Sequence, residues 1–195
     1  PISSRSPQAY RWCAAHRRWR NSSTIDWQVL REDASHFLWP LQVGVAVPNG
    51  LEKAVHTARA WCRRHTGSTT KVFLKLDFSN AFNSVSRTTV LQEVRDHFPQ
   101  LARWTTWCYG QPTRLQFGAR TLESCCGVQQ GDPLGPLLFS IALHKVAGSL
   151  RRQPLDLALF YLDDGALAGD IDNVAAVLQQ LQQDCLTIGL RLNLD

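Results

Sequence analysis

The sequence of 195 residues contains no methionine, no Cys-x-x-C pair and no long apolar run. Because no Cys-x-x-C spacing and no nearby histidine pair occur, a structural zinc site is not expected, and the cysteines are predicted to be free thiols. No stretch approaches the roughly 20 apolar residues that a membrane-spanning helix needs, and no signal peptide is visible. Since the chain begins at Pro1 and lacks methionine, it is predicted to be an internal segment of a longer protein.

Acidic residues are missing from the first 20 positions, which hold five of the 21 lysines and arginines. The rest of the chain is balanced in charge, so the whole net charge of +5 comes from this end. A basic segment with Tyr10, Trp12 and Trp19 can follow a phosphate backbone and stack on bases. It is equally compatible with a solvated chain end. Residues 1–26 are therefore left as an unassigned basic segment.

Beyond this segment, composition and hydrophobic periodicity are those of an ordinary globular domain with helices and strands. Helices are expected at 27–37, 51–65, 87–98, 99–109, from Asp132 and Pro133 to about Leu150, and at 173–187. Strands are expected at 42–47, 71–77 and 190–194, with one hairpin around Gly118 and a second whose tip is Asp163-Asp164-Gly165. With insertions set aside, the order from residue 71 is strand, helix, strand, strand, helix, strand. This order predicts an α+β fold with a ferredoxin-like split βαβ core, in which helices pack on one face of an antiparallel sheet.

Two adjacent carboxylates, Asp163 and Asp164, end an apolar run from Leu155 to Leu162. Asp-Asp-Gly is also ordinary turn chemistry. Two like charges at the mouth of an apolar hairpin need a cation between them, however, and Mg²⁺ prefers oxygen ligands. Asp77 ends the neighbouring predicted strand, where it can equally serve as a helix cap. Because the split βαβ pattern places that strand beside the hairpin, we expect the three carboxylates to meet and to hold two Mg²⁺ ions for phosphoryl transfer.

Four segments resemble the successive palm motifs of reverse transcriptases, in order. Their residues are similar to those of the non-LTR, LINE-type retrotransposon branch. The segments are Asp77-Phe78-Ser79-Asn80-Ala81-Phe82-Asn83, residues 127–136 (Gly-Val-Gln-Gln-Gly-Asp-Pro-Leu-Gly-Pro), Tyr161-Leu162-Asp163-Asp164, and Gly189-Leu190-Arg191-Leu192-Asn193. Gln42-Val43-Gly44-Val45 and the helix through His56 resemble what precedes the first motif. The resemblance implies a polymerase palm at residues 71–195, truncated within the fourth motif. It also implies partial fingers with a lead-in helix at 27–70, and no thumb.

The resemblance implies a catalytic metal site. Asp77 and Asp163 would be the main ligands, with Asp164 assisting and Phe78 offering its backbone carbonyl. The cofactor would be two Mg²⁺ ions, with Mn²⁺ as a substitute.

The resemblance also implies contacts with nucleotide and nucleic acid. Phe82 matches the bulky residue that excludes a 2′-hydroxyl, although ordinary core packing accounts for it as well. Gln130 and Gly131 match a loop that binds the incoming nucleotide, where glycine lets the backbone approach closely. Tyr161, Gly131 and Pro133 would contact the template and primer.

The implied activity is that of an RNA-directed DNA polymerase that adds dNTPs to a primer 3′-OH. The implied partners are an RNA template, a DNA primer and dNTP, together with the missing fingers, thumb and endonuclease regions of a parent polyprotein, and no membrane. A protein encoded by a retrotransposon is expected to act inside the cell, in the nucleus, although no targeting signal is visible in the sequence. Two features depart from the family: the lysine usual three residues after Asn193 falls beyond Asp195, and residues 1–26 lack an Arg-Pro fingers segment.

Two other interpretations stay open. RNA-dependent RNA polymerases generally carry a second aspartate where this chain has Phe82, so dNTPs are the expected substrate. The second alternative is a catalytically inactive retrotransposon relic or a nucleic-acid-binding fragment. Intact Asp77, Asp163 and Asp164 argue against long decay, whereas the unmatched residues 1–26 argue for it.

Overall fold

The computed structural model describes residues 27–129 and 131–193, so the basic segment at 1–26 lies outside the described residues. Its helices are α2 (Trp27–Leu38), α3 (Gly50–Arg64), α4 (Ala81–Ser84), α5 (Arg87–His97), α6 (Pro99–Tyr109), α7 (Gly135–Ala147), the 3₁₀ helix η1 (Gly148–Arg152) and α8 (Ile171–Thr187). Its strands are β1 (Lys71–Leu76), β2 (Thr113–Phe117), β3 (Arg120–Ser124), β4 (Leu157–Tyr161) and β5 (Asp164–Asp170). None of the described helices is long and apolar enough to cross a membrane. The described cysteines are free thiols, as predicted.

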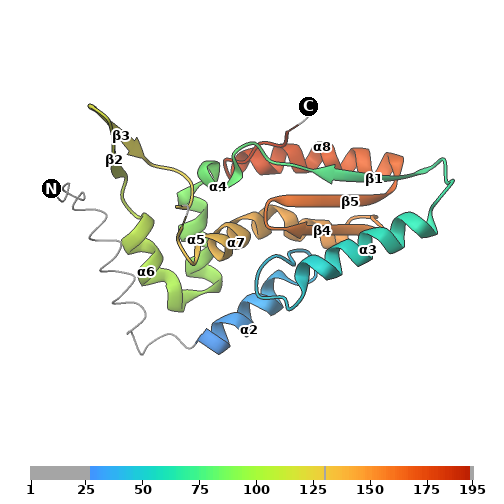
Figure 1. Cartoon of the computed structure of the whole chain (residues 1–195), viewed down its shortest axis with the longest axis horizontal. Helices are drawn as coiled ribbons and strands as arrows, with labels where there is room; N and C mark the ends of the chain where they lie inside the picture. The colour runs from blue at the N-terminus through green and yellow to red at the C-terminus, as the bar shows by residue number, and fades with distance from the viewer. Residues whose placement is uncertain (1–26, 130, 194–195) are drawn as a thin grey trace.

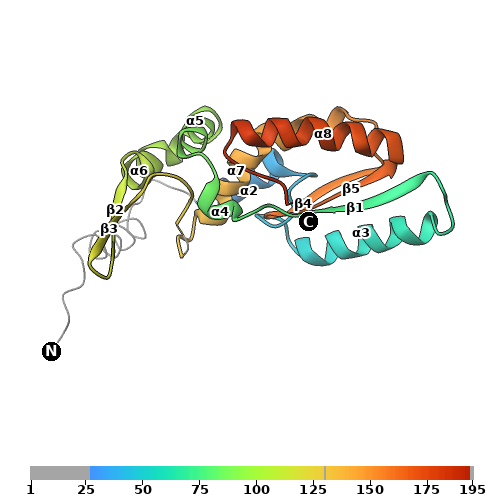
Figure 2. The same cartoon turned by 90° about the horizontal axis from the view of Figure 1, so that it is seen from above.

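The central sheet has the strand order β1-β5-β4, and both pairs are antiparallel. As the split βαβ pattern predicts, β1 lies beside the β4–β5 hairpin. Alternation along β1 directs Val72, Leu74 and Leu76 into the core, on the side of the sheet that α8 covers. Figure 2 shows α3 on the opposite side, where the ring of Trp61 lies 6.0 Å from that of Phe73. Helices therefore cover both faces of the sheet, rather than one face as predicted.

The predicted hairpin around Gly118 is confirmed as the two-stranded sheet β2–β3. It projects from the end of α6, away from the central sheet (Figure 1). Helices α5 and α6 pack against each other and connect this end of the molecule to α7. A single apolar core runs through both parts, from Phe98 and Leu101 to Phe139 and Phe160. The hairpin and the sheet are thus joined by packed helices.

Two predicted strands are wrong. At 42–47 only Gln42 forms a bridge, to Phe160, and Ala46 has a φ of 59°, which ends any extended run. At 190–194 the described residues form one bridge, between Leu192 and Phe78. The ladder cannot extend because the chain after Phe78 turns at Asn80, with a φ of 51°, to begin α4. The fourth strand of the split βαβ pattern is therefore reduced to this bridge.

The tip of the second hairpin lies earlier in the sequence than predicted. Tyr161 pairs with Asp164, so the loop consists of Leu162 and Asp163. Leu162 has a φ of 58°, as two-residue hairpin loops require. Gly165 lies inside β5 instead of in the turn. A Cβ at this position would lie 2.6 Å from a ring carbon of Phe160, so only glycine fits there. The glycine serves close packing within the sheet.

The predicted helix start at Asp132 and Pro133 is also wrong. The Asp132 carboxylate accepts a hydrogen bond from the Leu134 amide at 2.9 Å. The backbone carbonyl of Asp132 accepts one from the Gly135 amide at 2.9 Å. These bonds close a turn before the helix, so α7 begins at Gly135 and Pro136 occupies its first turn. The other predicted helices agree with the structure to within two residues at each end.

Candidate active site

The three predicted carboxylates lie at one end of the central sheet. The β1–β5 ladder extends to the pair Leu76 and Gly165. Asp77, which follows β1, and Asp164, which begins β5, therefore flank the same end of this ladder. Asp163 lies in the loop between β4 and β5. The register of the sheet thus brings together residues that are far apart in the sequence.

Two of these carboxylates have a polar partner close by. The Lys75 Nζ lies 3.2 Å from Asp164 Oδ1, and Asn193 Nδ2 donates to Asp77 Oδ2 at 3.3 Å. The Asn193 amide also donates to the Asp77 carbonyl at 2.8 Å. Both side chains of the Lys75–Asp164 pair are well exposed, so the pair contributes little to stability. Its lysine nevertheless offsets part of the repulsion among the carboxylates.

The oxygen donors at this edge suit a hard divalent cation, for which carboxylates are preferred ligands. The Asp77 and Asp164 side chains are exposed, and that of Asp163 is half-buried, so the donors are accessible. Within residues 27–129 and 131–193, no three His, Cys, Asp or Glu side chains are grouped closely enough to hold a metal ion. The donor chemistry therefore fits Mg²⁺, while the carboxylates lie at one edge without forming a closed cluster.

The loop that carries Asp163 is held by Gln42, a residue from much earlier in the chain. Gln42 is only 3% exposed, and its side-chain amide donates to the Leu162 carbonyl at 3.0 Å. Its Oε1 accepts hydrogen bonds from the Leu162 amide at 2.8 Å and from the Gly44 amide at 2.9 Å. The side chain thus pairs with both backbone groups of Leu162, as a neighbouring strand would. By sequence, Gln42 belongs to the segment that precedes the first motif. This contact could not be predicted from the sequence, because the partner of the Gln42 side chain is the backbone of Leu162.

The segment that resembles the second motif packs against the helices that follow Asp77. The Val128 amide donates to the Phe82 carbonyl at 2.8 Å. Arg87 is buried, and its Nε donates to the Gly127 carbonyl at 2.9 Å while its Nη2 donates to the Ser124 hydroxyl at 2.8 Å. The first two motifs are therefore joined by one direct hydrogen bond, and Arg87 links the second motif to the start of α5.

The two phenylalanines of the first motif contribute to the core to different degrees. Phe78 is buried, and its ring stacks at 6.5 Å on that of Phe160. Phe82 is half-buried, and its ring stacks on that of Phe139 at a centroid distance of 4.5 Å. The packing of Phe82 agrees with the core interpretation. Its remaining exposure, five residues after Asp77, leaves a face for the predicted contact with a sugar.

The remaining predicted contact residues occupy the surface near the carboxylates or the loop before α7. Tyr161 is half-buried at the end of β4, directly opposite Asp164. Gly131 is exposed and has a φ of 87°. Glycine is favoured here by this left-handed backbone conformation, because no other part of the described chain packs closely against it. Pro133 lies in the turn before α7. Gln130 lies outside the described residues.

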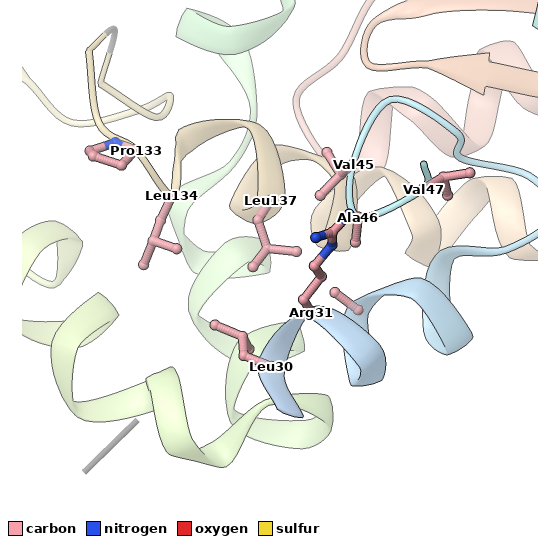
Figure 3. A pocket seen from close by; sticks show the side chains of 9 residues that line it. Leu30, Arg31, Val45, Ala46, Val47, Pro133, Leu134 and Leu137 are labelled. Atoms are coloured by element: carbon pink, nitrogen blue, oxygen red, sulfur yellow. The ribbon is translucent and has the colours of Figure 1, made fainter. Parts of the chain in front are cut away.

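A groove of about 370 Å³ adjoins this loop, between α2, residues 45–47 and the start of α7. Figure 3 shows Arg31 reaching from α2 toward Val45 and Ala46, opposite Pro133 and Leu137. Its lining is otherwise apolar and contains none of the predicted carboxylates. The groove is therefore a neighbour of the candidate site and not its centre.

This chain is similar to known proteins in sequence and in fold. Residues 18–195 match the family model described as reverse transcriptase (RNA-dependent DNA polymerase). The Retrovirus-related Pol polyprotein from type-1 retrotransposable element R2 of Nasonia vitripennis is 30% identical over an alignment 134 residues long, which covers 60% of this chain and 13% of that polyprotein.

Solved telomerase structures have a similar fold. Telomerase from Candida albicans, in complex with a TWJ fragment of telomeric RNA, matches 85% of this chain and 33% of its own with a TM-score of 0.62 and 13% identity. Apo telomerase from Candida tropicalis, truncated from its C-terminal domain, matches 85% of this chain and 38% of its own with a TM-score of 0.58 and 13% identity. At this identity the likeness shows the fold alone. The chain spans well under half the length of each of these proteins.

Proposed function

Because this chain belongs to the reverse transcriptase (RNA-dependent DNA polymerase) family, we propose that it forms the palm of an active RNA-directed DNA polymerase. In this proposal the enzyme adds dNTPs to the 3′-OH of a DNA primer on an RNA template. Residues 71–195 form the palm, and residues 27–70 form part of the fingers with a lead-in helix. The remaining fingers, the thumb and the endonuclease belong to the parent polyprotein, which acts in the nucleus.

The observation that carries the proposal is the position of Asp77, Asp163 and Asp164 at one end of the β1–β5 ladder. Asp77 and Asp163 are the proposed main ligands of two Mg²⁺ ions, which Mn²⁺ can replace. Asp164 assists, and Phe78 contributes its backbone carbonyl. Bound Mg²⁺ supplies charge neutralisation for the attacking 3′ oxygen and the leaving pyrophosphate.

The chain's own residues orient these ligands. Gln42 fixes the backbone of Leu162, the residue before Asp163. Asn193 holds Asp77 through both its backbone and its side chain. Lys75 pairs with Asp164, which suits an assisting carboxylate better than a main metal ligand.

The substrate assignment rests on the surroundings of Phe82. The Phe82 ring stacks on that of Phe139, which holds it in place. The sugar of a bound nucleotide would therefore contact a rigid surface. Gln130 and Gly131 are the proposed contacts to the incoming nucleotide. Tyr161, Gly131 and Pro133 are the proposed contacts to template and primer.

The test of the metal ligands is Asp163→Asn in the full-length protein, assayed by primer extension on an RNA template. We expect extension to fall by roughly 10²-fold or more, because the variant removes a negatively charged ligand that would hold Mg²⁺. The matched control is Asp172→Asn, an exposed aspartate at the start of α8, beyond the far end of β5. Extension that persists in Asp163→Asn would exclude this ligand assignment. Hybrid binding without extension in the wild type would favour the nucleic-acid-binding alternative.

The test of substrate choice is Phe82→Ala, assayed with dNTPs and rNTPs in the same protein. We expect a rise of roughly tenfold or more in the use of rNTPs relative to dNTPs, because the smaller side chain admits a 2′-hydroxyl. Val90→Ala, which trims a fully buried side chain of α5, is the control for weakened packing. If Phe82→Ala lowers the use of both substrates equally, as Val90→Ala should, Phe82 is only a core residue.

A further inference from the structure

The segment that carries Gly131 is a tight turn. The Asp132 amide donates to the Gln129 carbonyl at 3.1 Å, so Gln129 and Asp132 close a turn that carries Gly131. Gly131 has a φ of 87°, a left-handed conformation that favours glycine. A Cβ added to Gly131 would meet no described atom within 4 Å. A turn with such an open tip takes its placement from the contacts at its base.

One buried hydroxyl contacts both sides of that base. Tyr109, the last residue of α6, accepts a hydrogen bond from the Gln129 amide at 3.2 Å and donates one to Asp132 Oδ2. The other carboxylate oxygen of Asp132 accepts from the Leu134 amide at 2.9 Å. The Tyr109 hydroxyl therefore connects the beginning of the turn to its end and, through Asp132, to the chain that enters α7.

The surroundings of this hydroxyl keep it in its donating form. Tyr109 and Asp132 are 2% and 5% exposed, and a buried carboxylate needs hydrogen-bond donors. Burial, and then the nearby Asp132 charge, raise the pKa of Tyr109 well above its usual range, so the hydroxyl keeps its proton. The guanidinium of Arg87 lies 5.5 Å from the centre of the tyrosine ring while it also binds Gly127. The turn is thus held on both flanks by one buried polar network.

We propose that Tyr109 is a positioning residue for the turn that Gln129 and Asp132 close, and that its hydroxyl sets where Gly131 meets the incoming nucleotide. This inference rests on the proposed function, because it assigns the turn to nucleotide binding. It goes beyond that function in naming a residue that touches neither substrate nor metal. The ring of Tyr109 contributes to the core, so the hydroxyl is the part that the proposal concerns.

The test is Tyr109→Phe in the full-length protein, which keeps the ring and removes the hydroxyl. Losing a buried hydrogen bond should raise amide exchange in a peptide covering residues 127–134 by roughly tenfold, with exchange in α5 unchanged. In primer extension, the KM for dNTP should rise by roughly five- to twentyfold, with a change in kcat of less than about twofold. Thr105→Val is the matched control. It removes another buried hydroxyl of α6, one that donates to the Leu101 carbonyl at 3.0 Å.

Equal exchange and equal KM in Tyr109→Phe and Thr105→Val would overturn the proposal. Asp132→Asn gives a second route if Tyr109→Phe folds poorly, because asparagine has one carbonyl oxygen for the two donors of Tyr109 and Leu134. It should show the same exchange change, and the double variant should add little to either single one. If the wild type does not extend primers, the proposed function fails by itself. The exchange measurement still decides the inference, since faster exchange confined to the turn supports it and unchanged exchange refutes it.

Discussion

At the scale of single residues, Gln42 shows how a side-chain amide can replace a strand. Its donor and acceptor meet the carbonyl and amide of Leu162, and a third bond ties it to Gly44. These bonds support a residue whose φ of 58° is unfavourable for leucine. Asp163 follows directly, so the orientation of a proposed metal ligand depends on a side chain 120 residues away from Leu162.

Gln42→Glu tests this dependence with almost no change in shape. The carboxylate cannot donate to the Leu162 carbonyl, and its charge is buried, so the free energy of unfolding should fall by about 1–3 kcal/mol. The measurement is urea unfolding followed by circular dichroism, together with primer extension. Gln179→Glu, at an exposed position on α8, makes the same chemical change and should leave both unaltered. Equal unfolding midpoints for the two variants would contradict the role of Gln42.

The residues of the candidate site divide into those that a sequence can reveal and those that it cannot. Asp77, Asp163 and Asp164 stand in motifs whose order predicted the family, which the comparison confirms. Gln42 and Tyr109 were missed because their partners are backbone groups or a buried carboxylate in distant segments. Such a pairing leaves no period or spacing in the sequence.

At the scale of elements, the amphipathic helices and the paired strands were predictable because their apolar periodicity is long and regular. The α+β fold followed from their order, and the telomerase structures agree with it. Errors arose where backbone geometry overrides composition. Ala46 and Asn80 adopt left-handed conformations that end extended segments. The Asp-Gly pair at residues 164–165 reads as a turn, yet Gly165 is required inside a strand by the ring of Phe160.

At the scale of the whole molecule, three rings in contact join α2, α5 and α7, and one of them, His144, makes stability sensitive to acidic pH. His144 of α7 lies 4.4 Å from the ring of Phe37 in α2, which lies 4.6 Å from His97 of α5. Burial, followed by the charges of Arg151 and His97, lowers the pKa of His144 to about 4. Its Nδ1 is buried and has no hydrogen-bond partner among the described atoms. The packed helices therefore favour the neutral ring.

The direction of the resulting pH dependence follows from proton binding. An unfolded histidine takes up its proton near pH 6.5, whereas folded His144 stays neutral down to about pH 4. The unfolded chain thus binds more protons between these values, so this residue lowers the free energy of unfolding as the pH falls from 6.5 to 4. Above pH 6.5 it has no such effect.

His144→Phe should reduce the loss of stability at acidic pH, because phenylalanine keeps the ring contact with Phe37 and cannot bind a proton. The measurement compares thermal midpoints at pH 7 and pH 4.5 for the wild type and the variant. His56→Gln, at an exposed position on α3, controls for the loss of one histidine. A midpoint difference equal to that of the wild type would show that other groups govern the acid response.

The contact between Asn193 and Asp77 has a consequence for the order in which the protein is made. Asp77 leaves the ribosome 116 residues before the asparagine that binds both its carbonyl and its carboxylate. At translation rates of about 5–20 residues per second, this interval lasts roughly 6–23 s. A nascent chain that has completed β1, and even the whole β4–β5 hairpin, still lacks the residue that fixes this edge. Synthesis therefore separates the folding of the sheet from the completion of its acidic edge, which must wait until residue 193 has emerged.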